Sequence, residues 1–170
     1  MINGVGAIFL SLPTSRILLQ MRSKNVSHSG TWAFWGGKAE KGEQPLDTLQ
    51  RELEEEMGTN VPNYYNIVPL HVFESKNGFN YKTFIVTVFR EFVPELNGES
   101  SGYCWVDIGS WPKPLHSGAK LVFYDKSSID KIKTVATNLK DKRPDAKWMG
   151  KQQKPIKRML QHVILLFTTS

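Results

Sequence analysis

The chain has 170 residues, of which 40% are hydrophobic and 22% charged, and its formal net charge is +6. This length suits one domain, and the composition excludes a disordered or low-complexity chain. The single cysteine, Cys104, excludes an intramolecular disulfide, and no apolar stretch approaches the ~20 residues of a membrane span. We therefore expect a cytoplasmic protein with no membrane partner.

The first half of the chain predicts three strands and one long helix. Residues 3–11 form a short apolar run, and residues 16–21 and 32–35 are also typical of strands. Residues 45–57 change to helical periodicity, with Pro45 suited to the first turn and Gly58 placed to end the helix. One apolar stripe follows from the 3-4-4 spacing of Leu46, Leu49, Leu53 and Met57.

The second half predicts a hairpin, a further strand and two helices. The expected strands are 67–75, 80–92 and 103–106, and the expected helices are 127–139 and 155–167. An Asn77-Gly78 turn joins the first two strands. Strands around one strongly marked helix predict a mixed α/β (α+β) domain over residues 1–140, with residues 141–170 as a basic C-terminal extension on the same domain.

Positive charge gathers toward the C-terminus. Residues 131–158 hold ten Lys or Arg and two Asp, a net +8, so that the rest of the chain sums to −2. Such a segment can attract phosphates or RNA, and it can equally be a solvated surface. No zinc-finger or other nucleic-acid module is written in the spacing.

Three carboxylates share one face of the predicted helix 45–57. Glu52, Glu55 and Glu56 fall within about 100° of one another on a helical wheel, beside the apolar stripe. Like charges at this spacing destabilise an isolated helix unless a cation neutralises them. Hard divalent cations such as Mg²⁺ prefer these oxygen ligands and share them with substrate phosphates.

A glycine-rich turn, Gly36-Gly37-Lys38, precedes the helix. Glycines let a backbone approach a ligand closely, so a carbonyl of this turn is a candidate further metal ligand. Glu43 lies eight residues before Arg51, and these two side chains can pair to fix the loop against the helix.

The segment from Gly37 to Thr59 resembles the Nudix box, G-x5-E-x7-R-E-U-x-E-E-x-G-U, in which U is a bulky aliphatic residue. Eight specified residues match over the 22 positions from Gly37 to Gly58. The one departure is the final aliphatic position, which is Thr59 here. The resemblance implies a Nudix-like α/β/α sandwich with a central mixed β-sheet over residues 1–140.

By this resemblance, Glu52, Glu55, Glu56 and the Gly36 carbonyl would hold Mg²⁺ or Mn²⁺. The implied reaction is attack of metal-activated water on a phosphoanhydride bond of a nucleoside diphosphate linked to another group. The implied enzyme class is a Nudix hydrolase, an acid anhydride hydrolase of EC 3.6.1.-.

The resemblance assigns the remaining roles less uniquely. Glu43 and Arg51 would orient the loop and the helix, and the general base would be Glu52 or a later-loop glutamate, for which Glu99 is the candidate. Glu91 and Glu95 are weaker rivals.

The candidates for substrate contact are Lys38, Arg22 and Trp35. Lys38 and Arg22 could reach a phosphate, and Trp35 could stack on a nucleobase. Solvated charges and core packing are the competing interpretations.

Two other functions remain open from the sequence. One is a non-catalytic nucleotide- or RNA-binding protein that keeps the fold, although such proteins generally lose box glutamates. The other is a hydrolase acting on RNA 5′ ends through the basic segment. A nucleotide-derived substrate is the expected partner, a homodimer is compatible with the sequence, and the substrate itself is not written in the box.

Overall fold

The computed structural model describes residues 2–58 and 64–144. Six strands and three helices follow one another along these residues. Their bounds are β1 Ile2–Ser11, β2 Arg16–Arg22, β3 Trp32–Ala33, α1 Pro45–Met57, β4 Tyr64–Glu74, β5 Phe79–Val88, β6 Ser100–Asp107, α2 Ser117–Phe123 and α3 Lys126–Leu139. No helix among the described residues is long and apolar enough to cross a membrane.

The strands form one mixed sheet in the order β3-β2-β1-β5-β4, and β6 pairs with β2 along the length of β2, from Arg16 to Arg22. β1 runs parallel to β5 along its whole length, from Ile2 opposite Phe79 to Ser11 opposite Val88. The pairs β1–β2, β2–β3, β2–β6 and β4–β5 are antiparallel. The expected mixed sheet is therefore confirmed.

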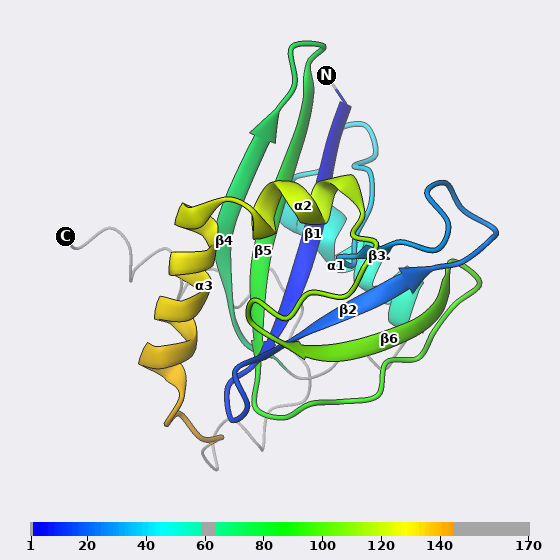
Figure 1. Ribbon diagram of the computed structural model, residues 1–170. Helices are drawn as coiled ribbons and strands as arrows, with labels where there is room; N and C mark the ends of the chain where they lie inside the picture. Colours follow the sequence, from blue (N-terminus) through cyan, green and yellow to red (C-terminus); the bar gives the residue numbers. More distant parts are fainter. Residues whose placement is uncertain (1, 59–63, 145–170) are drawn as a thin grey trace.

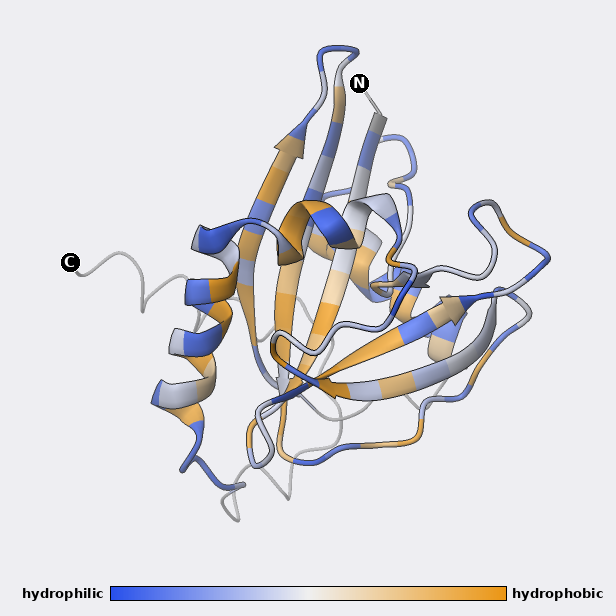
Figure 2. Ribbon diagram, viewed as in Figure 1, coloured by the Kyte–Doolittle hydropathy of each residue, from blue (hydrophilic) through white to orange (hydrophobic). Residues whose placement is uncertain are grey.

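Helices cover both faces of this sheet (Figure 1). On one face, α1 buries Leu49, Leu53 and Met57 against β1 and β5. On the other face, α2 and α3 pack on the same strands through their own core, which includes Phe123 and Ile132. Apolar residues fill the centre of the strands and the side of α3 toward the sheet (Figure 2). This arrangement is the expected α/β/α sandwich.

Several predicted elements differ from the structure in their bounds. β3 stops at Ala33 rather than residue 35, because Phe34 and Trp35 leave β2 and run toward β1. β5 ends at Val88 and not at residue 92, where the chain turns away from β4. Helix α2 was not predicted. The predicted helix 155–167 and the departure at Thr59 lie outside the described residues.

Candidate active site

The site forms where β1 and β2 separate. The two strands are paired only at Phe9 and Leu10 of β1, near their shared turn. Beyond that point, residues 34–38 take the vacated edge of β1, with isolated bridges formed by Trp35 and Lys38. The glycine turn therefore lies beside β1 as an extra stretch of sheet.

Both glycines of this turn are required by close contacts. Gly36 has a φ of +131°, and a Cβ there would overlap the carbonyl oxygen of Val5. A Cβ on Gly37 would overlap the Glu52 carboxylate. The Gly36 N–H donates to Oε2 of Glu56 at 2.7 Å, so the loop and the helix are joined directly.

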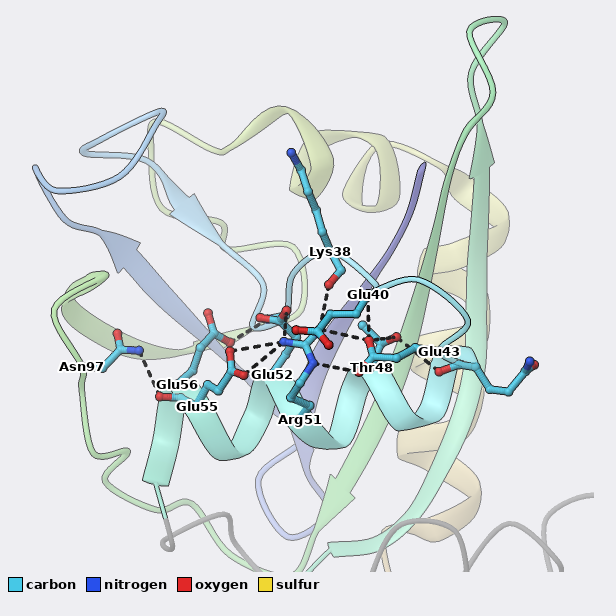
Figure 3. A network of polar contacts seen from close by, with 11 residues as sticks. Lys38, Glu40, Glu43, Thr48, Arg51, Glu52, Glu55, Glu56 and Asn97 are labelled. Carbon is cyan, nitrogen blue, oxygen red and sulfur yellow. Dashed lines mark hydrogen bonds and ion pairs between the residues drawn. The ribbon is translucent and has the colours of Figure 1, made fainter. Parts of the chain in front are cut away.

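Arg51 is the centre of the polar network on α1 (Figure 3). Its Nε donates to Oε1 of Glu43 at 2.9 Å, and its Nη2 donates to the Lys38 carbonyl at 2.8 Å. Its Nη1 donates to Oε1 of Glu52 at 2.9 Å and to Oε1 of Glu55 at 3.2 Å. One guanidinium thus connects the loop with two of the three helix carboxylates.

Glu43 is held as a carboxylate by this network. The Arg51 hydrogen bonds, followed by the Glu40 N–H at 2.8 Å and the Thr48 hydroxyl at 3.0 Å, lower the pKa of Glu43 to about 2. The geometry supports the architectural role expected for Glu43 and Arg51, since both act on the position of the loop.

The three helix carboxylates have different surroundings. The side chain of Glu55 is 58% exposed, that of Glu52 is 14% exposed, and Glu56 is buried at 5%. Burial raises the pKa of Glu56 to about 8, and repulsion from Glu52 and Glu99 acts in the same direction. Burial is also the main cause that raises the pKa of Glu52. A negative charge on Glu52 or Glu56 is therefore costly unless a cation lies nearby.

The donors that face Glu56 are neutral. Besides the Gly36 N–H, the amide of Gln20 donates to Oε1 of Glu56 at 3.3 Å and to the Phe34 carbonyl at 2.9 Å. Gln20 is itself buried and accepts from the Ser100 hydroxyl. Sequence reasoning missed Gln20, although a single amide within the apolar run 16–21 was a visible signal.

No preformed metal cluster is found within residues 2–58 and 64–144, judged by groups of three or more His, Cys, Asp or Glu side chains. Arg51 lies between Glu52 and Glu55, and Glu56 faces Gly36 and Gln20. The donor chemistry nevertheless suits a hard cation, because all three side chains supply oxygen and the buried Glu56 has only neutral partners.

The charge of Glu99 contributes to the raised pKa of both Glu52 and Glu56. The loop that carries Glu99 is joined to α1 by Asn97, whose Nδ2 donates to the Glu55 carbonyl at 3.1 Å. It is joined to the residue after β2 by the Ser23 N–H, which donates to the Glu99 carbonyl at 2.8 Å. Its rival Glu91 pairs instead with Arg16 at 3.3 Å.

The three candidates for substrate contact lie in different surroundings. Trp35 is fully buried in the core on the α1 face, which favours core packing over stacking on a nucleobase. The Lys38 ammonium extends away from the carboxylates (Figure 3). Arg22 donates from Nε to the Ser27 carbonyl at 2.7 Å, which folds it onto its own loop.

Comparison with known proteins decides the family. Residues 2–125 match the NUDIX domain. The chain belongs to the Nudix hydrolase family. The resemblance carried by the box is thereby confirmed.

Two curated relatives are named for different substrates. One is an 8-oxo-dGTP diphosphatase of Haemophilus influenzae, 35% identical over 118 residues that cover 63% of this chain and 79% of that protein. The other is the m7GpppN-mRNA hydrolase of Saccharomyces cerevisiae, 29% identical over 116 residues and 65% of this chain. The matched region spans only 11% of the yeast protein.

Solved structures agree on the Nudix fold. The MutT Nudix hydrolase of Burkholderia pseudomallei is 23% identical, with a TM-score of 0.56 over 73% of this chain and 96% of that one. A MutT structure from a study of Aliivibrio salmonicida and Vibrio cholerae has a TM-score of 0.58 and the same identity, over 79% of this chain and 98% of that one.

Proposed function

We propose that this chain hydrolyses a phosphoanhydride bond in a nucleoside diphosphate linked to another group. The observation that carries the proposal is the set of three carboxylates on α1, joined by Arg51 and Gly36 to the glycine turn. The family membership supports the same reaction class. Mg²⁺ or Mn²⁺ is the cofactor that these oxygen donors suit best.

Glu52, Glu55 and Glu56 would hold the cation, with the Gly36 carbonyl as a further ligand. When bound, the cation would polarise the phosphoryl oxygens and lower the pKa of a water molecule. Binding requires Glu52 and Glu55 to exchange part of their Arg51 contact for the cation. Arg51 keeps its hold on the loop through Glu43 and the Lys38 carbonyl, so the loop stays in place.

The general base is proposed to be Glu52 or Glu99. The Glu52 side chain is mostly buried and lies against Gly37, whereas Glu99 is an exposed residue on the neighbouring loop. Comparing Glu52→Gln with Glu99→Gln separates the two. Because Glu52 is also a proposed cation ligand, the Glu99 variant decides: loss of turnover with Mn²⁺ affinity retained makes Glu99 the base, and turnover equal to the wild type leaves Glu52.

A substrate panel tests the proposed reaction. It contains 8-oxo-dGTP, ADP-ribose, a nucleotide sugar and a dinucleoside polyphosphate, each with Mg²⁺, with Mn²⁺ and with EDTA. We expect cation-dependent release of phosphate-containing products from at least one of them, with 8-oxo-dGTP examined first because a relative is named for it. Tight nucleotide binding with no turnover of any substrate would instead support the non-catalytic alternative.

A hydrolase for RNA 5′ ends is a second candidate. The yeast relative is named as an mRNA hydrolase, and the basic residues 131–158 offer positive charge. Capped RNA is therefore compared between the full chain and a chain ending at residue 144. The truncation removes five of the ten basic residues. A steep salt dependence of RNA binding that becomes clearly weaker on truncation supports this candidate, and weak binding in both chains excludes it.

A further inference from the structure

A tyrosine on β5 reaches toward the carboxylates across a surface that has no side chains. Tyr81 is paired with Gly4 of β1, and its ring leans along that strand toward Gly6. A Cβ on Gly4 would lie 2.7 Å from Cδ2 of the ring, and a Cβ on Gly6 would lie 2.6 Å from the hydroxyl oxygen. Only glycines at both positions leave room for the phenol.

The same glycines adjoin the glycine turn. A Cβ on Gly36 would lie 3.0 Å from the Cα of Gly6, and a Cβ on Gly4 would lie 3.1 Å from the Gly37 carbonyl oxygen. We call Gly4, Gly6, Gly36 and Gly37 the glycine floor. It connects the Tyr81 hydroxyl to the two glycines that contact Glu56 and Glu52.

The Tyr81 side chain is half-buried, and its ring packs on Phe79 at 6.1 Å between centroids. Among residues 2–58 and 64–144, the hydroxyl makes no hydrogen bond and does not belong to the buried polar atoms that lack a partner, so it is accessible to a ligand. Its electrostatic neighbours are Glu56, Glu52 and Arg22, and burial followed by the two carboxylates raises its pKa. The hydroxyl therefore keeps its proton at neutral pH and can donate it.

We propose that Tyr81 is a substrate-positioning residue whose hydroxyl donates a hydrogen bond to a phosphate oxygen of the bound nucleotide. This proposal rests on the proposed function. A phosphate is the proposed ligand because it would lie over the glycine floor, beside Glu52 and Glu56, the proposed cation ligands. The negatively charged phosphate oxygens would need both a cation and neutral hydrogen-bond donors over the glycine floor.

The central test is Tyr81→Phe, which keeps the ring on the glycine floor and removes only the hydroxyl. Tyr124→Phe is the matched control, because Tyr124 is 68% exposed at the end of α2. Binding is measured by calorimetry with α,β-methylene-GTP and Mg²⁺, and turnover with the best substrate of the panel.

We expect Tyr81→Phe to raise both Kd and KM about tenfold, the effect of losing one hydrogen bond to a charged group, while kcat changes less than about threefold. Tyr124→Phe should match the wild type. The melting temperature of Tyr81→Phe should stay within about 2 °C of the wild type, because no protein hydrogen bond is lost.

A second variant moves the hydroxyl instead of removing it. Gly6→Ala places a methyl group against the hydroxyl oxygen and should weaken binding of α,β-methylene-GTP in the wild-type background. In the Tyr81→Phe background the same change should cost clearly less, because the displaced group is already absent. Equal costs in both backgrounds would contradict a role for the hydroxyl.

The outcomes separate the two proposals. If the wild type binds and turns over nucleotides and Tyr81→Phe does the same with unchanged constants, the Tyr81 proposal is wrong and the function stands. If Tyr81→Phe loses kcat alone, a positioning role in binding is also wrong. If the wild type neither binds α,β-methylene-GTP nor turns over any substrate, the proposed function is wrong and the role of Tyr81 falls with it.

Discussion

At the residue scale, Arg51 serves two purposes in this structure. It pairs with Glu43 to hold the loop, and its Nη1 contacts both Glu52 and Glu55, which reduces the repulsion between these carboxylates. A lysine carries the same charge but lacks the planar fork that makes these contacts simultaneously.

Arg51→Lys should therefore lower the free energy of unfolding by about 1–3 kcal/mol, since the guanidinium is mostly buried and its partners lose several bonds at once. Urea unfolding with EDTA present measures this effect without a cation. Lys126→Arg, a change in an exposed i,i+4 pair, is the control and should be neutral. Equal stability of Arg51→Lys and the wild type would show that the network contributes little.

The glycine turn gives a second prediction at this scale. Gly36→Ala places a Cβ against the Val5 carbonyl oxygen, whereas Gly42→Ala meets nothing within 4 Å although its φ is +86°. The first change should cost at least about 3 kcal/mol, and the second about 1 kcal/mol from backbone strain alone. Thermal unfolding of the two variants compares them. Similar losses would mean that contact with β1 does not determine the glycine.

At the element scale, α2 begins on a titratable cap. Nδ1 of His116 accepts from the Gly118 N–H at 3.1 Å, and the ring contacts His28 at 5.0 Å between centroids. Burial, and then repulsion from Arg22 and His28, lowers the pKa of His116. A protonated imidazole cannot accept this hydrogen bond, so the cap works only in the neutral form.

His116 should stabilise the fold above its unfolded-state pKa near 6.5 and lose this contribution as the pH falls through its lower folded-state pKa. His116→Ala should lose about 1 kcal/mol at pH 7.5 and progressively less at acid pH. His116→Asn keeps a capping oxygen that does not titrate. The pH dependence of stability that comes from the cap should therefore be absent in this variant. Urea midpoints between pH 5 and 8 measure it, and a stability gain on acidification would contradict the sign.

At the scale of the whole molecule, contiguous signals were predictable and long-range ones were not. Helix α1 has the bounds expected from Pro45, its apolar stripe and Gly58, because all three signals lie within one segment. Helix α2 was not predicted, because seven residues are too few to show a helical hydrophobic period. Trp35 was open to two interpretations until its place between β1 and α1 was known.

The residues of the site also divide into those that lie close together in the sequence, which were predictable, and those that do not. The spacing within the box identified the carboxylates, Glu43 and Arg51, since these lie on one helix and its adjoining loop. Gln20 and Tyr81 come from β2 and β5, and only the separation of β1 and β2 brings them to the glycine turn. No local pattern encodes that approach, because it depends on the register of the sheet.

The central claim is that the α1 carboxylates bind a divalent cation for hydrolysis. The most direct measurement compares Glu56→Gln with Glu54→Gln in Mn²⁺ binding by calorimetry and in hydrolysis of the best panel substrate. Glu54 lies on the same helix but is exposed and accepts from Gln50 at 2.9 Å, so its variant is the matched control.

Glu56→Gln should lose Mn²⁺ affinity and at least about a hundredfold in kcat/KM, while its stability without metal stays equal or rises because a buried acid is replaced by a neutral amide. Glu54→Gln should bind Mn²⁺ and hydrolyse substrate as the wild type does. Wild-type Mn²⁺ affinity and turnover in a folded Glu56→Gln variant would contradict the account.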